Sequence, residues 1–281
     1  GFGPFIMISV LVSLAVVPIL VSVGKTPSFE SAESVSLRQL FLVSPLGVVG
    51  MLVGSIAMGT IFGMGAVYAS SIGLSVQEIS FFMASIIAGG AVMQIPVGQM
   101  SDVFGRRLII IGICLVGALA SLFASHFSGS GWQLYAVIAL VGGLSTPLYS
   151  LCVAHTNDYL SQPQMIAASG SLVLVNGIGA AIGPPVTAFA MEQLGSLAFF
   201  YSIAVSLGLV AIFGLWRSTR REAVAQEDQG AFVVMAPTPI SVGFNPDVEL
   251  EEIEAATEVD AATVQTSFDE LVDELNDPKE P

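Results

Sequence analysis

The sequence predicts an all-α membrane protein with seven transmembrane helices, and three observations lead to that prediction. The 281-residue chain is 54% hydrophobic and 11% charged, with a mean hydropathy of +0.82, whereas soluble domains carry about 25% charged residues. Seven apolar stretches are long enough to cross about 30 Å of hydrocarbon, which takes roughly 20 helical residues. Lys and Arg occur only in alternate connections between these stretches. Lipid is therefore the expected solvent for most of the chain.

The expected spans follow one another with short connections. Helix is the only open-chain structure that satisfies backbone N–H and C=O groups in lipid. Ser44 and Pro45 mark the start of the second span, because Ser caps helices and Pro suits the first turn. We place the spans at residues 4–23, 46–70, 79–99, 106–125, 132–154, 165–191 and 196–217.

The basic residues predict the orientation of the chain. The connections 71–78, 126–131 and 192–195 contain no Lys or Arg. By the positive-inside rule, the N-terminus of this chain lies outside and the C-terminal tail is cytoplasmic. The connection 155–164 follows by alternation alone. Its His155, at a helix end, is expected to be a surface or capping residue, and a pH-responsive group is the alternative. The residues that set the orientation are Lys25, Arg38, Arg106, Arg107, Arg217, Arg220 and Arg221.

Charge divides the chain into a nearly neutral body and an acidic tail. Residues 218–281 hold 16 of the 22 acidic residues, which argues against a nucleic-acid partner. We expect most of this tail to be disordered. Its segment 267–275 has capping-box spacing and an apolar helical face, so it is either a docking helix for a cytoplasmic partner or a transient helix.

One connection carries most of the charge found within the apolar part of the chain. Residues 98–107 follow the pattern G-x-x-x-D-x-x-G-R-R. Gly98 and Gly105 lack a Cβ and permit a tight turn. Asp102 and Arg106 are near enough to pair, and Asp102 could instead face the positive N-terminus of a neighbouring helix. A contact that breaks when helices rearrange would act as a conformational latch; a solvated turn is the alternative.

This connection resembles the signature loop of the major facilitator superfamily of secondary transporters, whose pattern runs roughly G-x-L-A-D-R-x-G-R-R/K. The resemblance implies a latch, although Val103 replaces the family's Arg after the Asp, so one arm of the family's charge relay is missing and the latch is weaker. The latch residues that the chain keeps are Gly98, Asp102, Gly105, Arg106 and Arg107.

Three spans precede this loop rather than two, so the resemblance implies its second copy, between helices eight and nine. Residues 1–23 then correspond to helix six, 24–45 to the central cytoplasmic loop and 46–217 to the C-terminal six-helix half. The N-terminal half would be a missing partner, and half of the midplane substrate site would be absent. We expect residues 1–281 alone not to transport. Alternatively, the last six spans are an N-terminal half preceded by an extra helix.

Two further stretches carry the resemblance. Residues 155–160 read His-Thr-Asn-Asp-Tyr-Leu, and residues 177–185 read Gly-Ile-Gly-Ala-Ala-Ile-Gly-Pro-Pro. Both resemble a bacterial branch of the superfamily, which implies a multi-pass protein of the bacterial cytoplasmic (inner) membrane. The second stretch also resembles the family's antiporter motif, but a kink at Gly183, Pro184 and Pro185 in a packed helix is the interpretation we favour.

Small and polar residues within the spans are the remaining candidates. Ser55, Gly59 and Gly63, and likewise Gly179 and Gly183, have the spacing that lets helices approach closely. The spans contain no interior Asp, Glu, Lys or Arg, so they supply no evident proton carrier. Polar side chains line the substrate cavity or form interhelical hydrogen bonds. The cavity candidates are Asn176, Tyr149, Gln94 and Ser145, with Tyr68 as a further polar residue.

The predicted function is secondary active transport of a small molecule by alternating access, with the lipid bilayer and the substrate as partners. The apolar spans favour a hydrophobic or amphipathic substrate. We expect no enzyme activity, cofactor or metal. The alternative is a stand-alone seven-helix receptor or interaction protein. Retinal is excluded, because Lys25 and Lys279 both lie in polar segments.

Overall fold

The structure, a computed structural model, describes residues 2–21, 36–127, 131–220 and 232. The chain divides into two units, residues 1–32 and 33–281. The first contains α1 (Gly3–Val21), an apolar helix over the predicted span 4–23. The predicted docking segment 267–275 and most of the acidic tail lie outside the described residues.

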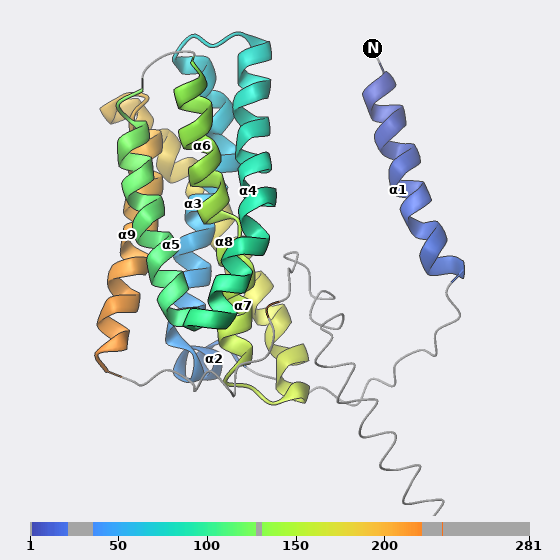
Figure 1. The fold of residues 1–281 in the computed structure, drawn as a ribbon, viewed down its shortest axis with the longest axis vertical. Helices are drawn as coiled ribbons and strands as arrows, with labels where there is room; N and C mark the ends of the chain where they lie inside the picture. Colours follow the sequence, from blue (N-terminus) through green and yellow to red (C-terminus); the bar gives the residue numbers. More distant parts are fainter. Residues whose placement is uncertain (1, 22–35, 128–130, 221–231, 233–281) are drawn as a thin grey trace, which may run out of the picture. The chain divides into compact units, whose positions relative to one another are not determined.

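The second unit is a helical bundle (Figure 1). Six stretches of it are long and apolar enough to cross a membrane, with α6 and α7 together forming one of them. These spans confirm the prediction of an all-α membrane protein, and α1 contributes a shorter apolar helix over Phe5–Leu14. The helices of this unit are α2 (Leu37–Val43), α3 (Pro45–Ser71), α4 (Val76–Phe104), α5 (Arg106–Ala124), α6 (Trp132–Ser145), α7 (Leu148–Asn157), α8 (Gln162–Leu194) and α9 (Ala198–Ser218).

The polar connection before α3 ends in a short capped helix. Ser36 precedes α2 and forms a capping box with Gln39, in which each side chain accepts a hydrogen bond from the other residue's backbone N–H. Helix α3 then begins at Pro45, as the sequence predicts. Ser44 occupies the N-cap position, but its hydroxyl makes no capping hydrogen bond. That prediction of a side-chain cap was therefore wrong.

The span predicted at 132–154 is interrupted near its centre. Helix α6 ends at Ser145 and α7 begins at Leu148. Pro147 has no N–H and cannot continue the hydrogen-bond ladder. The hydroxyl of Thr146 turns back to the Gly142 carbonyl at 2.8 Å, which is also the acceptor of the Thr146 N–H.

The helices pack in an internally repeated pattern. Helix α3 packs along α8, α4 packs along α6, and α5 packs along α9. The next most extensive contacts are those of α3 with α9 and of α6 with α5. In this pattern α3 corresponds to α6–α7, α4 to α8 and α5 to α9. Each of the contacts named above has its counterpart when every helix is replaced by the one that corresponds to it. The bundle is thus built from two related three-span units, α3–α5 and α6–α9.

Glycines make the same contact at the two equivalent interfaces. Between α3 and α8, a Cβ on Gly59 would meet the Ala180 carbonyl, and one on Gly183 would meet the Ile56 carbonyl. Between α6 and α4, Gly142 faces the Ile86 carbonyl in the same way, and Gly89 faces that of Ala139. Helix backbones therefore touch directly at both interfaces, which accounts for the small residues in the sequence.

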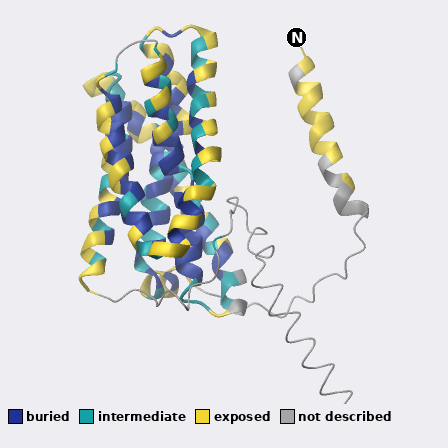
Figure 2. Cartoon of the chain, in the orientation of Figure 1, coloured by how far each residue is buried: buried dark blue, intermediate teal, exposed yellow. Residues whose placement is uncertain are grey.

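The two helices α4 and α8, which are equivalent in this repeat, are the least covered. Only 28% of the apolar window of each is buried, compared with 50% or more in the other four spans. Figure 2 shows exposed residues along their outer faces and buried residues inside the bundle. The core includes a cluster of aromatic rings where α3, α4 and α9 meet, formed by Tyr68, Phe82, Phe199 and Phe200.

Candidate functional site: the α4–α5 turn and its ion pair

The predicted loop 98–107 is a turn of a single residue. Helix α4 continues to Phe104 and α5 begins at Arg106, so only Gly105 departs from helical structure. Gly105 has φ of 86°, a left-handed conformation that favours glycine. The prediction of a tight glycine turn was right, but most of the expected loop is the end of α4. The charged residues are consequently held on two rigid helix ends.

Arg106 forms a buried ion pair across the bundle. Its Nη1 donates to Oδ1 of Asp158, directly after α7, and to the Ala154 carbonyl at 3.1 Å. The side chains of Arg106 and Asp158 are each 3% exposed. Asp102 was a possible partner of Arg106 by sequence, and the ion pair in the structure is with Asp158. This pair joins the start of α5 to the end of α7.

Burial dominates the electrostatics of this site. It raises the pKa of Asp158 from 3.8 to about 6. The Arg106 charge and hydrogen bond oppose that rise, while the negative charge of Asp102 adds to it. Asp102, Arg106 and Asp158 are thus electrostatically linked, although they come from the ends of three different helices. Protonation of Asp158 would remove the counter-charge of Arg106.

Asp102 also receives a contact from the tail. Its Oδ1 accepts a hydrogen bond from the Phe232 backbone N–H at 3.1 Å. The Phe232 ring lies against Gly98, about one turn before Asp102 on α4, where a Cβ would collide with it. Gly98 therefore serves ring packing rather than the chain reversal expected of it.

His155 is buried, contrary to the expectation of a surface position. It lies in the last turn of α7 and is 5% exposed. Its ring meets the ring of Tyr159 edge-on, with 5.4 Å between centroids. Arg107, the last residue of the predicted latch, lines a cavity together with His155. The reason for burial is that α7 extends past the predicted end of the span, to Asn157.

The polar candidates inside the spans lie in different environments. Asn176 on α8 is half-buried and accepts a hydrogen bond from the Ser55 hydroxyl on α3, at 2.6 Å. A second polar pair on the same two helices, Thr60 and Thr187, is fully buried with 2.8 Å between its hydroxyl oxygens. Asn176 therefore makes an interhelical hydrogen bond, and its place in a substrate cavity stays a prediction.

The remaining candidates are spread over three helices. Tyr149 on α7 and Gln94 on α4 are half-buried. Ser145 is buried at the end of α6, and its hydroxyl has no hydrogen-bond partner among the described residues. Tyr68 belongs to the aromatic cluster and is fully buried.

Helix α8 is continuous through Gly183, Pro184 and Pro185. Pro184 leaves the Ala180 carbonyl without its helical donor, and this carbonyl is the one that faces Gly59 of α3. The Pro184 ring itself lies against Gly63. The two prolines thus contribute to the α3–α8 contact, and a kink at this position stays a prediction.

Sequence reasoning missed the parts of the site that depend on tertiary contacts. Asp158 lies within the motif 155–160, but nothing in the sequence indicated its partner. Asn157 is 6% exposed, and both polar atoms of its side chain have no hydrogen-bond partner within the described part of the chain. The available signal was the run of four polar residues, 155–158, at the end of an apolar span.

The fold and the site together define a polytopic helical membrane protein, built from two related three-span units and carrying a charged glycine turn at its helix ends. The sequence profile of the Major Facilitator Superfamily matches residues 46–249, which include all six spans of the bundle. The chain belongs to this superfamily.

Two relatives show how much of a longer protein this chain matches. The "Uncharacterized MFS-type transporter YcaD" of Escherichia fergusonii is 27% identical over 218 residues, which cover 76% of this chain and 55% of the relative. The protein of the same description from Escherichia coli (strain K12 / DH10B) is 24% identical over 208 residues, covering 72% and 52%. The chain spans about half the length of the curated relatives it matches.

Proposed function

We propose that this chain is the C-terminal half, with the preceding helix, of a secondary active transporter that moves a small molecule across the bacterial inner membrane by alternating access. The observation that carries the proposal is the superfamily match to residues 46–249, together with an alignment that covers only 55% of the first relative. The N-terminus of this chain lies outside and the tail is cytoplasmic, as the positive-inside rule suggests.

The missing N-terminal half packs against the outer faces of α4 and α8. These faces are the least covered of the six spans, and the two helices are equivalent in the internal repeat. Superfamily transporters bind substrate between such halves near the bilayer midplane. Asn176 and Tyr149, both half-buried, are our candidates for this half of the cavity, and an apolar or amphipathic substrate suits the apolar spans.

The residues Gly98, Asp102, Gly105, Arg106 and Arg107 act as a conformational latch. The ion pair between Arg106 and Asp158 supports this role, because it fixes the turn to α7 in the present arrangement. Asp102 at the end of α4 remains the group that exchanges partners when the halves move. The hydrogen bond from the Phe232 N–H suggests that a backbone N–H group can serve as one of the partners of the Asp102 carboxylate.

Transport by the intact protein, with every segment that is encoded together with this chain, tests the proposal. Uptake and efflux of a panel of small molecules are measured in cells with and without the protein. We expect one class of substrate to respond, and Asn176→Ala and Tyr149→Phe to alter its kinetics at equal protein abundance. Unchanged kinetics in both variants would remove these residues from the cavity, and residues 1–281 alone are expected to be inactive.

A further inference from the structure

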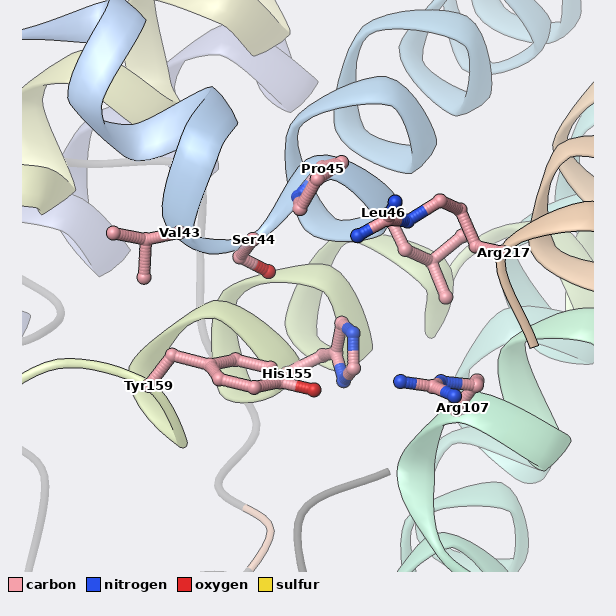
Figure 3. Close-up of a pocket in the computed structure, with 8 residues that line it drawn as sticks. All are labelled: Val43, Ser44, Pro45, Leu46, Arg107, His155, Tyr159 and Arg217. Atoms are coloured by element: carbon pink, nitrogen blue, oxygen red, sulfur yellow. The ribbon is translucent and has the colours of Figure 1, made fainter. Parts of the chain in front are cut away.

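We propose that the helix ends around Ser44, Arg107 and Arg217 form a binding site for the phosphate group of an anionic phospholipid. Five helix ends line the pocket: the starts of α3 and α5, and the ends of α2, α7 and α9. Figure 3 shows the Arg107 guanidinium pointing toward the His155 ring, with Arg217 reaching over Leu46 from α9. Among the residues that the structure describes, no Asp or Glu lines this pocket.

Two arginines and the first-turn N–H groups of α3 supply donors for an anion there, while the ends of α2, α7 and α9 carry the opposite helix dipole. The guanidinium groups of Arg107 and Arg217 are half-buried and come from different helices. The 27-residue helix α3 also begins at the pocket, with Pro45 and Leu46 in its lining. Helix N-termini attract anions, because the first-turn N–H groups have no helical acceptor and the helix dipole is positive there.

The hydroxyl of Ser44 is the observation that points to a ligand. Ser44 is 1% exposed and lines the pocket, yet its Oγ has no hydrogen-bond partner within the described residues. A buried hydroxyl without a partner carries a desolvation cost. A ligand oxygen in the pocket would accept its hydrogen bond. The enclosed space is about 10 Å³, roughly what one water-sized group needs, so it admits a single phosphate oxygen while the phosphorus lies at the mouth.

An adjoining apolar trough favours a lipid over a free anion. This second cavity has a volume of about 200 Å³ and shares Arg107 and His155 with the pocket. Its charged residues other than Arg107 are Arg106 and Asp158, which pair with each other. The remainder is mostly apolar, and its exposed side chains include Phe104, Leu108 and Leu215. An acyl chain along the trough would cover them while its phosphate meets the arginines.

The site lies where lipid headgroups are found. All five helices begin or end at this pocket, and α3, α5 and α9 are candidate membrane spans. An anionic headgroup is preferred to a zwitterionic one, because the cationic part of a zwitterionic headgroup would be repelled by two arginines. The proposal concerns the bound lipid and does not depend on which substrate the protein transports.

The test is native mass spectrometry of the intact protein in detergent, titrated with phosphatidylglycerol or with phosphatidylcholine carrying the same acyl chains. We expect phosphatidylglycerol to bind about tenfold more tightly at its strongest site. Arg217→Gln should weaken that site about tenfold, as expected for one charge-assisted hydrogen bond. Arg220→Gln is the matched control, since Arg220 lies just beyond α9 near the ring of Trp216, 6.0 Å from its centroid, and does not line the pocket.

Ser44→Ala provides a second variant, which removes only the buried hydroxyl and should lower phosphatidylglycerol binding several-fold. Equal binding of the two lipids, or equal losses in Arg217→Gln and Arg220→Gln, would overturn the proposal. A competition with inorganic phosphate in large excess separates the two sources of the anion. Retention of the lipid supports a phospholipid site, whereas complete displacement would show that the site takes a free anion.

Discussion

Arg106, the first residue of α5, is paired with Asp158, the residue that follows α7, and both side chains are buried. The pair joins the two three-span units of the bundle at one end of the molecule. The pKa of Asp158 rises to about 6 although Arg106 opposes the rise. Desolvation therefore outweighs attraction, and the pair specifies an arrangement of helices more than it adds stability.

Breaking the ion pair on one side should be costly. Asp158→Ala would leave Arg106 buried without its counter-charge, and we expect a loss of about 3–5 kcal/mol in the free energy of unfolding. The double variant Arg106→Met with Asp158→Leu should lose much less, because an apolar pair removes the desolvation cost. Denaturant unfolding of the intact protein in detergent checks both. A small effect of Asp158→Ala would mean that the pair is not buried as described.

The ion pair also predicts a dependence of stability on pH. The folded state holds the Asp158 proton more strongly than the unfolded state, because its pKa is raised from 3.8 to about 6. The stability from this proton is fully present below about pH 4 and is lost as the pH rises through about 6. The difference in melting temperature between wild type and Asp158→Asn should change over that window. A constant difference would contradict the raised pKa.

Direct backbone contact between helices predicts which glycines tolerate a methyl group. Gly59→Ala and Gly142→Ala would push a Cβ into the carbonyls of Ala180 and Ile86, and we expect each to cost about 1–3 kcal/mol of unfolding free energy. Gly112→Ala on α5 is the control, because nothing lies near its Cβ position; helix propensity there favours Ala by about 1 kcal/mol. Similar losses in all three variants would refute the close approach.

The hydrogen bond between Ser55 and Asn176 should appear as a coupling energy. In a double-mutant cycle of Ser55→Ala and Asn176→Ala, we expect about 0.6 kcal/mol, the average for such pairs in membrane proteins. The cycle on Thr60→Val and Thr187→Val, the fully buried pair of the same interface, serves for comparison. If the losses in unfolding free energy from Ser55→Ala and Asn176→Ala were strictly additive, the hydrogen bond would contribute nothing to stability.

The spans could be predicted from the sequence, because a membrane helix needs an apolar stretch of sufficient length and backbone groups that are satisfied within the helix. Apolar length fixed their positions, and Ser44 with Pro45 located the start of α3. The spacing of Gly59 and Gly63 on one helix, and of Gly179 and Gly183 on another, correctly indicated close packing, since small residues let helices approach closely whichever helix they meet. The same local reasoning missed the break at Pro147, because the apolar stretch continues across it.

The residues that contact one another at the α4–α5 turn could not be predicted from such local patterns. Arg106 and Asp158 are 52 residues apart, and nothing local indicates that the start of α5 and the end of α7 meet. The pairing follows from the repeated arrangement of the helices, which periodicity does not reveal. Burial of His155 likewise depends on where α7 ends. Gly98 was expected to serve the turn, whereas its neighbour in the structure is Phe232 of the tail.

The most direct measurement for the central claim is the accessibility of a cysteine at position 149 from each side of the membrane. Tyr149→Cys is placed in the intact protein with Cys114 and Cys152 replaced by Ala, and membrane-impermeant maleimide is applied to right-side-out and inverted vesicles. An alternating-access transporter predicts labelling from both faces, with Asp102→Asn raising one rate and lowering the other. Two results would contradict a latch that controls access to this cavity. One is labelling that is absent from one or both faces, and the other is labelling rates that Asp102→Asn leaves unchanged.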